Sequence, residues 1–149
     1  MIRPVLRYCA LVRVPFKGGP LTVSSDASTI HERPAELLQQ LIRFDTTNPP
    51  GNEAECVSYI KGLLDEAGIE GTILARTPER PNLVARLPGQ GKAPPLLLHG
   101  HVDVVTTEKQ EWRQPPFEGK VEGGFIWGRG ALDMKGGVAM MLSAVLRAK

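Results

Sequence analysis

Residues 95–100, PLLLHG, form a continuous apolar block that ends in glycine. A short block with leucine at consecutive positions is typical of a strand that is buried on both faces. Two shorter apolar runs precede it, GTILA at 71–75 and NLVARL at 82–87, and GFIWGRG follows at 124–130. These runs predict neighbouring strands of one sheet, and such a sheet needs helices to cover it.

Segments with helical spacing lie on both sides of these runs. PAELLQQLIRF at 34–44 opens with proline, which suits a first helical turn, and repeats leucine and isoleucine along one face. AECVSYIKGLLDEAG at 54–68 has the same spacing and ends at Gly68, a helix-capping residue. MKGGVAMMLSAVLRAK at 134–149 predicts an apolar helix. The predicted fold is α/β, a mixed sheet with flanking helices.

The first 33 residues differ from the rest. The first 25 residues carry Arg3, Arg7, Arg13 and Lys17 and no acidic residue. Arginines interrupt the apolar stretch that a secretory signal needs, so we expect no export and a cytoplasmic location. We predict a poorly ordered extension over residues 1–33 and a partial domain over residues 34–149.

The charge balance argues against a polyanionic partner. The chain has 18 basic and 16 acidic residues and a formal net charge of +2, so we expect neither nucleic acid nor an anionic membrane as partner. The longest charge-free run, residues 136–146, is shorter than the roughly 18 apolar residues of a bilayer span. A small-molecule partner is expected. Cys9 and Cys56 lack metal-motif spacing and are predicted to be unpaired thiols.

His101 and Asp103 follow the predicted strand 95–100, and ligands of α/β sheets bind beyond the carboxyl ends of strands. Side chains two residues apart on extended backbone face the same way, so these two can meet each other or one metal. A carboxylate bonded to one ring nitrogen leaves the other nitrogen free to ligate. The tripeptide alone equally allows a solvated loop. His99 is predicted to be a hydrogen-bonded core histidine.

Asp133 lies among glycines in GRGALDMKGG, residues 128–137. It could cap the following helix through its side-chain oxygen, and its two oxygens could also bridge two cations. The two roles do not exclude each other. A phosphate-binding loop is excluded, because the second glycine before Lys135 and the Ser or Thr after it are absent.

Several motifs carry a family resemblance, and they occur in the order ELLQQLIRFDTTNPPGNE, PNLVARLPG, LLLHGHVDVV, EWRQPPF and IWGRGALDMKGGVAMML. Together they resemble the amino-terminal part of the dinuclear zinc metallohydrolases, which include aminoacylases, acetylornithine deacetylase, succinyl-diaminopimelate desuccinylase and glutamate carboxypeptidases. The resemblance implies an incomplete zinc aminopeptidase-like catalytic domain over residues 34–149. It implies that His101 ligates zinc, that Asp103 is the catalytic carboxylate orienting His101, and that Asp133 bridges two zinc ions.

The resemblance implies hydrolysis of amide or peptide bonds in N-acyl amino acids or small peptides, with two Zn²⁺ ions that Co²⁺ or Mn²⁺ could replace. After Asp133 the chain contains no Asp, Glu or His. We therefore expect the general base, the remaining ligands and the family's lid domain, with any homodimer it forms, to be missing. Glu53, Glu55, Asp65 and Glu66 are expected on solvated helix faces. The alternative function is a non-catalytic truncated remnant that binds metal weakly or not at all.

Overall fold

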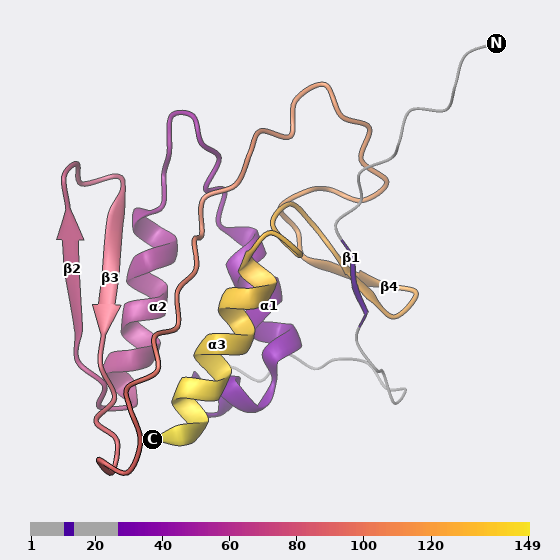
Figure 1. Ribbon diagram of the computed structural model, residues 1–149. Helices are drawn as coiled ribbons and strands as arrows, with labels where there is room; N and C mark the ends of the chain where they lie inside the picture. Colours follow the sequence, from indigo (N-terminus) through magenta and orange to yellow (C-terminus); the bar gives the residue numbers. More distant parts are fainter. Residues whose placement is uncertain (1–10, 14–26) are drawn as a thin grey trace.

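The computed structural model describes residues 11–13 and 27–149. In chain order its elements are β1 (Leu11–Arg13), the 3-10 helix η1 (Ala27–Glu32), α1 (Pro34–Arg43), α2 (Ala54–Glu66), β2 (Gly71–Ala75), β3 (Pro81–Ala85), β4 (Lys120–Glu122), β5 (Phe125–Trp127) and α3 (Lys135–Ala148) (Figure 1). The α/β class is confirmed. The named strands pair antiparallel, and parallel pairing is found, within the described residues, at a bridge between Thr47 and Val104.

The helices form where the apolar spacing predicts them. α1 begins at Pro34, whose fixed φ suits a first helical turn and whose missing N–H is not needed there. α2 ends in a Schellman motif, in which Gly68 N–H donates to Asp65 O at 2.8 Å and Ile69 N–H donates to Leu64 O at 2.8 Å. Gly68 has a φ of 69°, which glycine adopts without strain.

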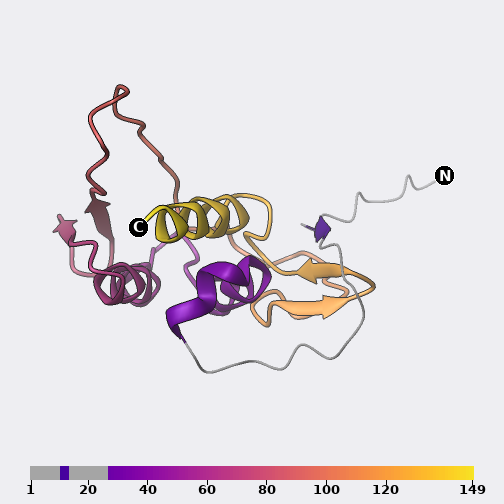
Figure 2. The same ribbon diagram turned by 90° about the horizontal axis from the view of Figure 1, so that it is seen from below.

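The hydrophobic core lies between the helices. α3 packs against α1 and η1, and from below α3 lies across from α1 and α2 (Figure 2). The core side chains of the three α-helices are Leu37, Leu38, Leu41, Ile42, Cys56, Ile60, Leu63, Leu64, Ala139, Leu142 and Leu146.

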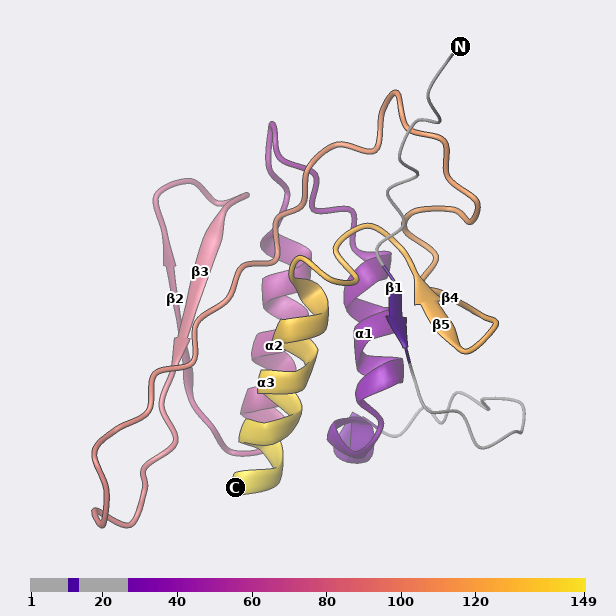
Figure 3. The ribbon, with the colours of Figure 1, turned by 45° about the vertical axis from the view of Figure 1, so that its right-hand side comes forward.

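Two small sheets flank the helices on opposite sides (Figure 3). β2 and β3 form a hairpin against α2, with Ile73 opposite Leu83. The other sheet has the order β1-β5-β4, with Val12 and Val121 both opposite Ile126. The apolar runs at 71–75, 82–87 and 124–130 therefore do contain strands.

The predicted buried strand at 95–100 is wrong for the described residues. This segment runs between the β2–β3 hairpin and α3 (Figures 1 and 3) but has no regular secondary structure. Leu96 is 83% exposed and Leu97 is 85% exposed, and His99 is exposed rather than in the core. The physical reason is pairing: β2 and β3 bond to each other, and the described residues supply no strand that bonds to this segment.

Part of the predicted amino-terminal extension can be placed. Residues 1–10 and 14–26, with Cys9, lie outside the described residues. Within the extension, β1 pairs with β5 and η1 places Ile30 in the core. The domain division at residue 33 stays a prediction. In the part of the chain that the structure describes, no helix is long and apolar enough to cross a bilayer.

Candidate metal centre

The loop between α1 and α2 holds the segment that carries His101. Thr46 accepts from Val104 N–H at 3.0 Å through its carbonyl, and Asn48 N–H donates to Val104 O at 2.8 Å. The buried Thr46 hydroxyl donates to Val102 O at 2.6 Å. These bonds use backbone groups of a loop that is not in a sheet, and they fix the backbone on which His101 and Asp103 stand.

The loop that carries Asp133 packs directly on the same segment. Gly130 has a φ of 81°, and a Cβ there would lie 2.8 Å from Cγ1 of Val104, so only glycine allows this approach. Gly130 O accepts from Lys135 N–H at 2.8 Å, at the start of α3. Gly130 thus admits the side chain of Val104 from the neighbouring segment.

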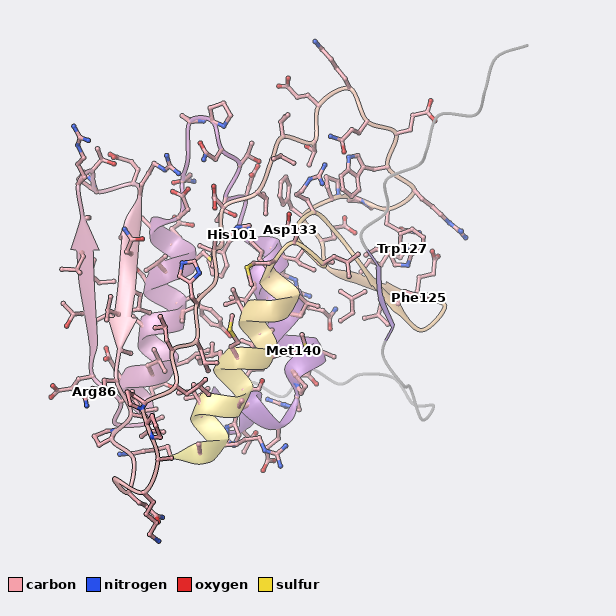
Figure 4. All side chains as sticks on the ribbon, in the orientation of Figure 1. Arg86, His101, Phe125, Trp127, Asp133 and Met140 are labelled. Atoms are coloured by element: carbon pink, nitrogen blue, oxygen red, sulfur yellow. The ribbon has the colours of Figure 1, made fainter. Side chains whose placement is uncertain are left out.

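The three residues singled out from the sequence come together in space. Nε2 of His101 lies 3.1 Å from Oδ1 of Asp133, and Figure 4 labels the two residues next to each other near the start of α3. Nδ1 of His101 lies 3.2 Å from Oδ1 of Asp103 and 3.1 Å from the backbone oxygen of Asp103. The imidazole is therefore held between two aspartates that are 30 residues apart in sequence.

Both ring nitrogens of His101 have an oxygen atom opposite them. A neutral imidazole donates from one ring nitrogen only, yet both nitrogens of His101 face oxygen. A metal ion at Nε2, or a rotation of the exposed Asp133 carboxylate, removes the resulting contact between lone pairs. Two ligands about 2.0–2.1 Å from one tetrahedral zinc lie about 3.3 Å apart, close to the 3.1 Å between Nε2 and Asp133 Oδ1. The same 3.1 Å is also that of an ordinary hydrogen bond, so it is the donor types, an imidazole nitrogen and a carboxylate oxygen, that fit a metal.

Asp133 is not a helix cap. The residue that precedes the first turn of α3 is Met134, and no side chain caps that end. The Asp133 side chain is 90% exposed, and the Asp133–Met134 peptide is cis. The capping alternative is wrong, and the carboxylate stays available to a ligand.

The centre lacks enough ligands to hold a metal tightly. Within the described residues, no group of three or more His, Cys, Asp or Glu side chains gathers as a metal site would require. Catalytic zinc usually has three protein ligands. His101 and Asp133 therefore supply part of a site, and we find no third ligand beside them in the described chain.

Three residues near Asp103 were not predicted from the sequence to belong to the site: Asn48, Glu53 and Arg80. Asn48 Nδ2 donates to Asp103 Oδ2 at 3.0 Å, and Arg80 lies between Asp103 and Glu53. The expectation that Glu53 is solvated is wrong, because its side chain is only 7% exposed. The apolar spacing of α2 does not predict that Glu53 is buried, because Glu53 lies just before the first residue of the helix. Its burial depends on a β2–β3 turn that is distant in sequence.

Two buried ionisable groups lie beneath the loop of Asp133. Lys135 is fully buried and its Nζ donates to Phe44 O at 2.7 Å. Burial lowers the pKa of Lys135, against smaller opposing effects of Cys56 and Asp45. Burial raises the pKa of the Cys56 thiol to about 11, so this free cysteine is a poor metal ligand at neutral pH.

Comparison with known proteins identifies similar sequences. Residues 97–149 match the model of the peptidase family M20/M25/M40. The chain is 45% identical over 118 residues to succinyl-diaminopimelate desuccinylase of Methylobacterium sp. (strain 4-46), covering 76% of the chain and 29% of that relative.

Two further relatives give the same picture. Succinyl-diaminopimelate desuccinylase of Methylorubrum extorquens is 42% identical over 76% of the chain and 30% of its own length. N-formyl-4-amino-5-aminomethyl-2-methylpyrimidine deformylase of Halalkalibacterium halodurans is 40% identical over 73% of the chain and 26% of its own length. The chain thus spans less than a third of the length of these relatives.

Proposed function

Because the chain belongs to the peptidase family M20/M25/M40, we propose that it contributes to a metal-dependent hydrolase of amide or peptide bonds in N-acyl amino acids or small peptides. The single observation that carries this proposal is the placement of His101 Nε2 within 3.1 Å of Asp133 Oδ1, with Asp103 behind the ring. The names of the relatives support the substrate class, since desuccinylase and deformylase both denote removal of an acyl group.

In this proposal, His101 and Asp133 hold Zn²⁺, with Co²⁺ or Mn²⁺ as possible replacements. When bound, the metal supplies Lewis acidity for the amide carbonyl and makes water a nucleophile at neutral pH. Asp103 accepts from Nδ1–H of His101, which keeps the lone pair on Nε2. Asp133 adds negative charge on the open side of the ring, where its exposed carboxylate reaches solvent.

The general base and the further ligands come, in this proposal, from polypeptide other than the described residues. A hydrolysis of this kind needs a group that takes a proton from water and passes it to the leaving amine. No acidic residue follows Asp133. The second candidate function is therefore a non-catalytic chain that binds metal weakly or not at all, and the absence of a three-ligand group among the described residues favours it.

Metal-dependent turnover tests the proposal. The chain is assayed with N-succinyl, N-formyl and N-acetyl amino acids and Zn²⁺, by itself and with polypeptide supplying the remaining length of the Methylobacterium relative. We expect release of free amine in the combined sample and none from the chain by itself. A chelator and Asp133→Asn should each abolish turnover, because each removes the metal or one of its ligands.

Asp65→Asn is the matched control, because Asp65 pairs with Lys61 on the exposed face of α2, far in sequence from the site. It should leave turnover unchanged. The absence of turnover in both samples favours the second candidate. Turnover that persists in chelator, or in Asp133→Asn, contradicts the proposed metal centre.

A further inference from the structure

Both oxygens of the Asp103 carboxylate contact polar groups of other residues. Its Oδ1 faces Nδ1 of His101 at 3.2 Å. Its Oδ2 accepts from Asn48 Nδ2 at 3.0 Å and lies 3.9 Å from Nη2 of Arg80. The side chain is only 34% exposed. Asn48 and Arg80 come from two loops, one before α2 and one after β2, that are distant from Asp103 in sequence.

Arg80 is itself held in place. Its Nε donates to Oε1 of the buried Glu53 at 3.3 Å. A Cβ on Gly51 would lie 2.5 Å from Arg80 Nε, so the arginine side chain lies directly on the backbone of Gly51. The turn that carries Arg80 is tied to the same loop, because Glu79 O accepts from Glu53 N–H at 2.9 Å and from Ala54 N–H at 3.2 Å.

The charges explain why this arrangement holds together. Burying a carboxylate without a partner is unfavourable, so Glu53 requires the guanidinium of Arg80. Glu53 Oε2 is buried with no hydrogen-bond partner in the described residues, which leaves Arg80 as the cation on which Glu53 depends. The same guanidinium then faces Asp103 with its free nitrogen, so one cation serves two carboxylates.

We propose that Asn48 and Arg80, with Glu53 behind Arg80, are positioning residues that fix the rotation of the Asp103 carboxylate and thereby the tautomer of His101. With Oδ2 hydrogen-bonded to Asn48 and facing the guanidinium of Arg80 at ion-pair distance, Oδ1 is presented to Nδ1 of His101, beside the backbone oxygen of Asp103 that lies 3.1 Å from the same nitrogen. The Asp133 carboxylate, which faces Nε2, competes with Asp103 for the ring proton. Its side chain is exposed and can rotate away from the ring. The inference rests on the proposed function, because its purpose is to keep the Nε2 lone pair available to a metal.

The first readout is the tautomer of His101 in the metal-free protein. Long-range ¹H–¹⁵N correlation of the histidine rings, at about pH 8 where imidazole is mostly neutral, distinguishes protonation at Nδ1 from that at Nε2. His101→Gln assigns the signal among the three histidines. We expect the Nδ1–H form in the wild type and a clear rise of the Nε2–H form in Asn48→Ala and in Arg80→Gln.

The second readout is Zn²⁺ affinity by calorimetry. Loss of groups that orient a metal-ligating histidine typically weakens binding by about 10–100-fold, and we expect this range for Asn48→Ala and Arg80→Gln. Arg80→Lys should be intermediate, because lysine keeps the charge but loses the fork of donors. Arg76→Gln is the matched control: Arg76 is exposed at the other end of the same turn, and its replacement should change neither readout.

The outcomes separate the positioning role from a purely structural one. Circular dichroism establishes that each variant is folded, and if Arg80→Gln unfolds, Asn48→Ala decides. Folded variants with the wild-type tautomer and wild-type affinity overturn the proposal. If the wild type binds no Zn²⁺, the metal centre of the proposed function fails, and the tautomer result then decides the positioning role without it.

Discussion

At the scale of single residues, the amine of Lys135 and the thiol of Cys56 are two ionisable groups that folding buries. Lys135 and Cys56 both lie within the helical core beneath the candidate centre, and burial shifts their pKa values in opposite directions. For Lys135 the lowered pKa means that stability increases as the pH rises toward the ordinary value of 10.5. For Cys56 the sign is reversed.

Cys56 should make the chain less stable at alkaline pH. Its pKa rises from 9.0 to about 11 on folding, so the stabilisation is complete below pH 9 and is lost as the pH rises through about 11. The expected loss is on the order of 2–3 kcal/mol of unfolding free energy. Urea unfolding of wild type and Cys56→Ala at several pH values checks this, with the difference between them isolating Cys56 from Lys135. Parallel pH profiles for the two proteins would contradict the prediction.

At the scale of elements, the helices follow from local pattern and the third apolar run does not. α1 and α2 begin and end where proline, glycine and apolar spacing predict, because these signals act within one or two helical turns. The run at 95–100 has the composition of a buried strand, but a strand forms only with a neighbour to bond. No local signal reports whether that neighbour is present.

Gly62 inside α2 and Gly68 just beyond its end should respond to replacement by alanine in opposite directions. Gly62 lies inside the helix, and a Cβ there would meet nothing within 4 Å, so Gly62→Ala should raise the unfolding free energy by about 0.5–1 kcal/mol. Gly68 has a φ of 69°, so Gly68→Ala should lower it by about 1–2 kcal/mol. Urea unfolding measures the unfolding free energy of both variants. If both replacements change it in the same direction, the helix end differs from this description.

At the scale of the whole molecule, exposed leucines distinguish this structure from the sequence expectation. Leu96 and Leu97 are more than four-fifths exposed, so Leu96→Gln and Leu97→Gln should each change the unfolding free energy by no more than about 0.5 kcal/mol. Leu41→Ala, at a fully buried position, should lower it by about 2–5 kcal/mol. A large loss of stability at Leu96 would mean that this segment is buried after all.

Much of the candidate centre could be anticipated from sequence, and its support could not. His101 and Asp103 share a face because they are two residues apart on extended backbone. The approach of Asp133 to the same ring was available only through resemblance to a family. Asn48, Glu53 and Arg80 carried no signal, since each acquires its role from contacts with loops that are distant in sequence.

The sequence by itself determined the helices and the segments that form β2 and β3, because each depends on neighbours within a few positions. The tertiary structure decided that PLLLHG lies unpaired, that Glu53 is buried, and that His101 stands between Asp103 and Asp133. Those outcomes depend on which distant segments meet. Burial, pairing and charge balance are properties of such contacts, so they exist only once the chain has folded.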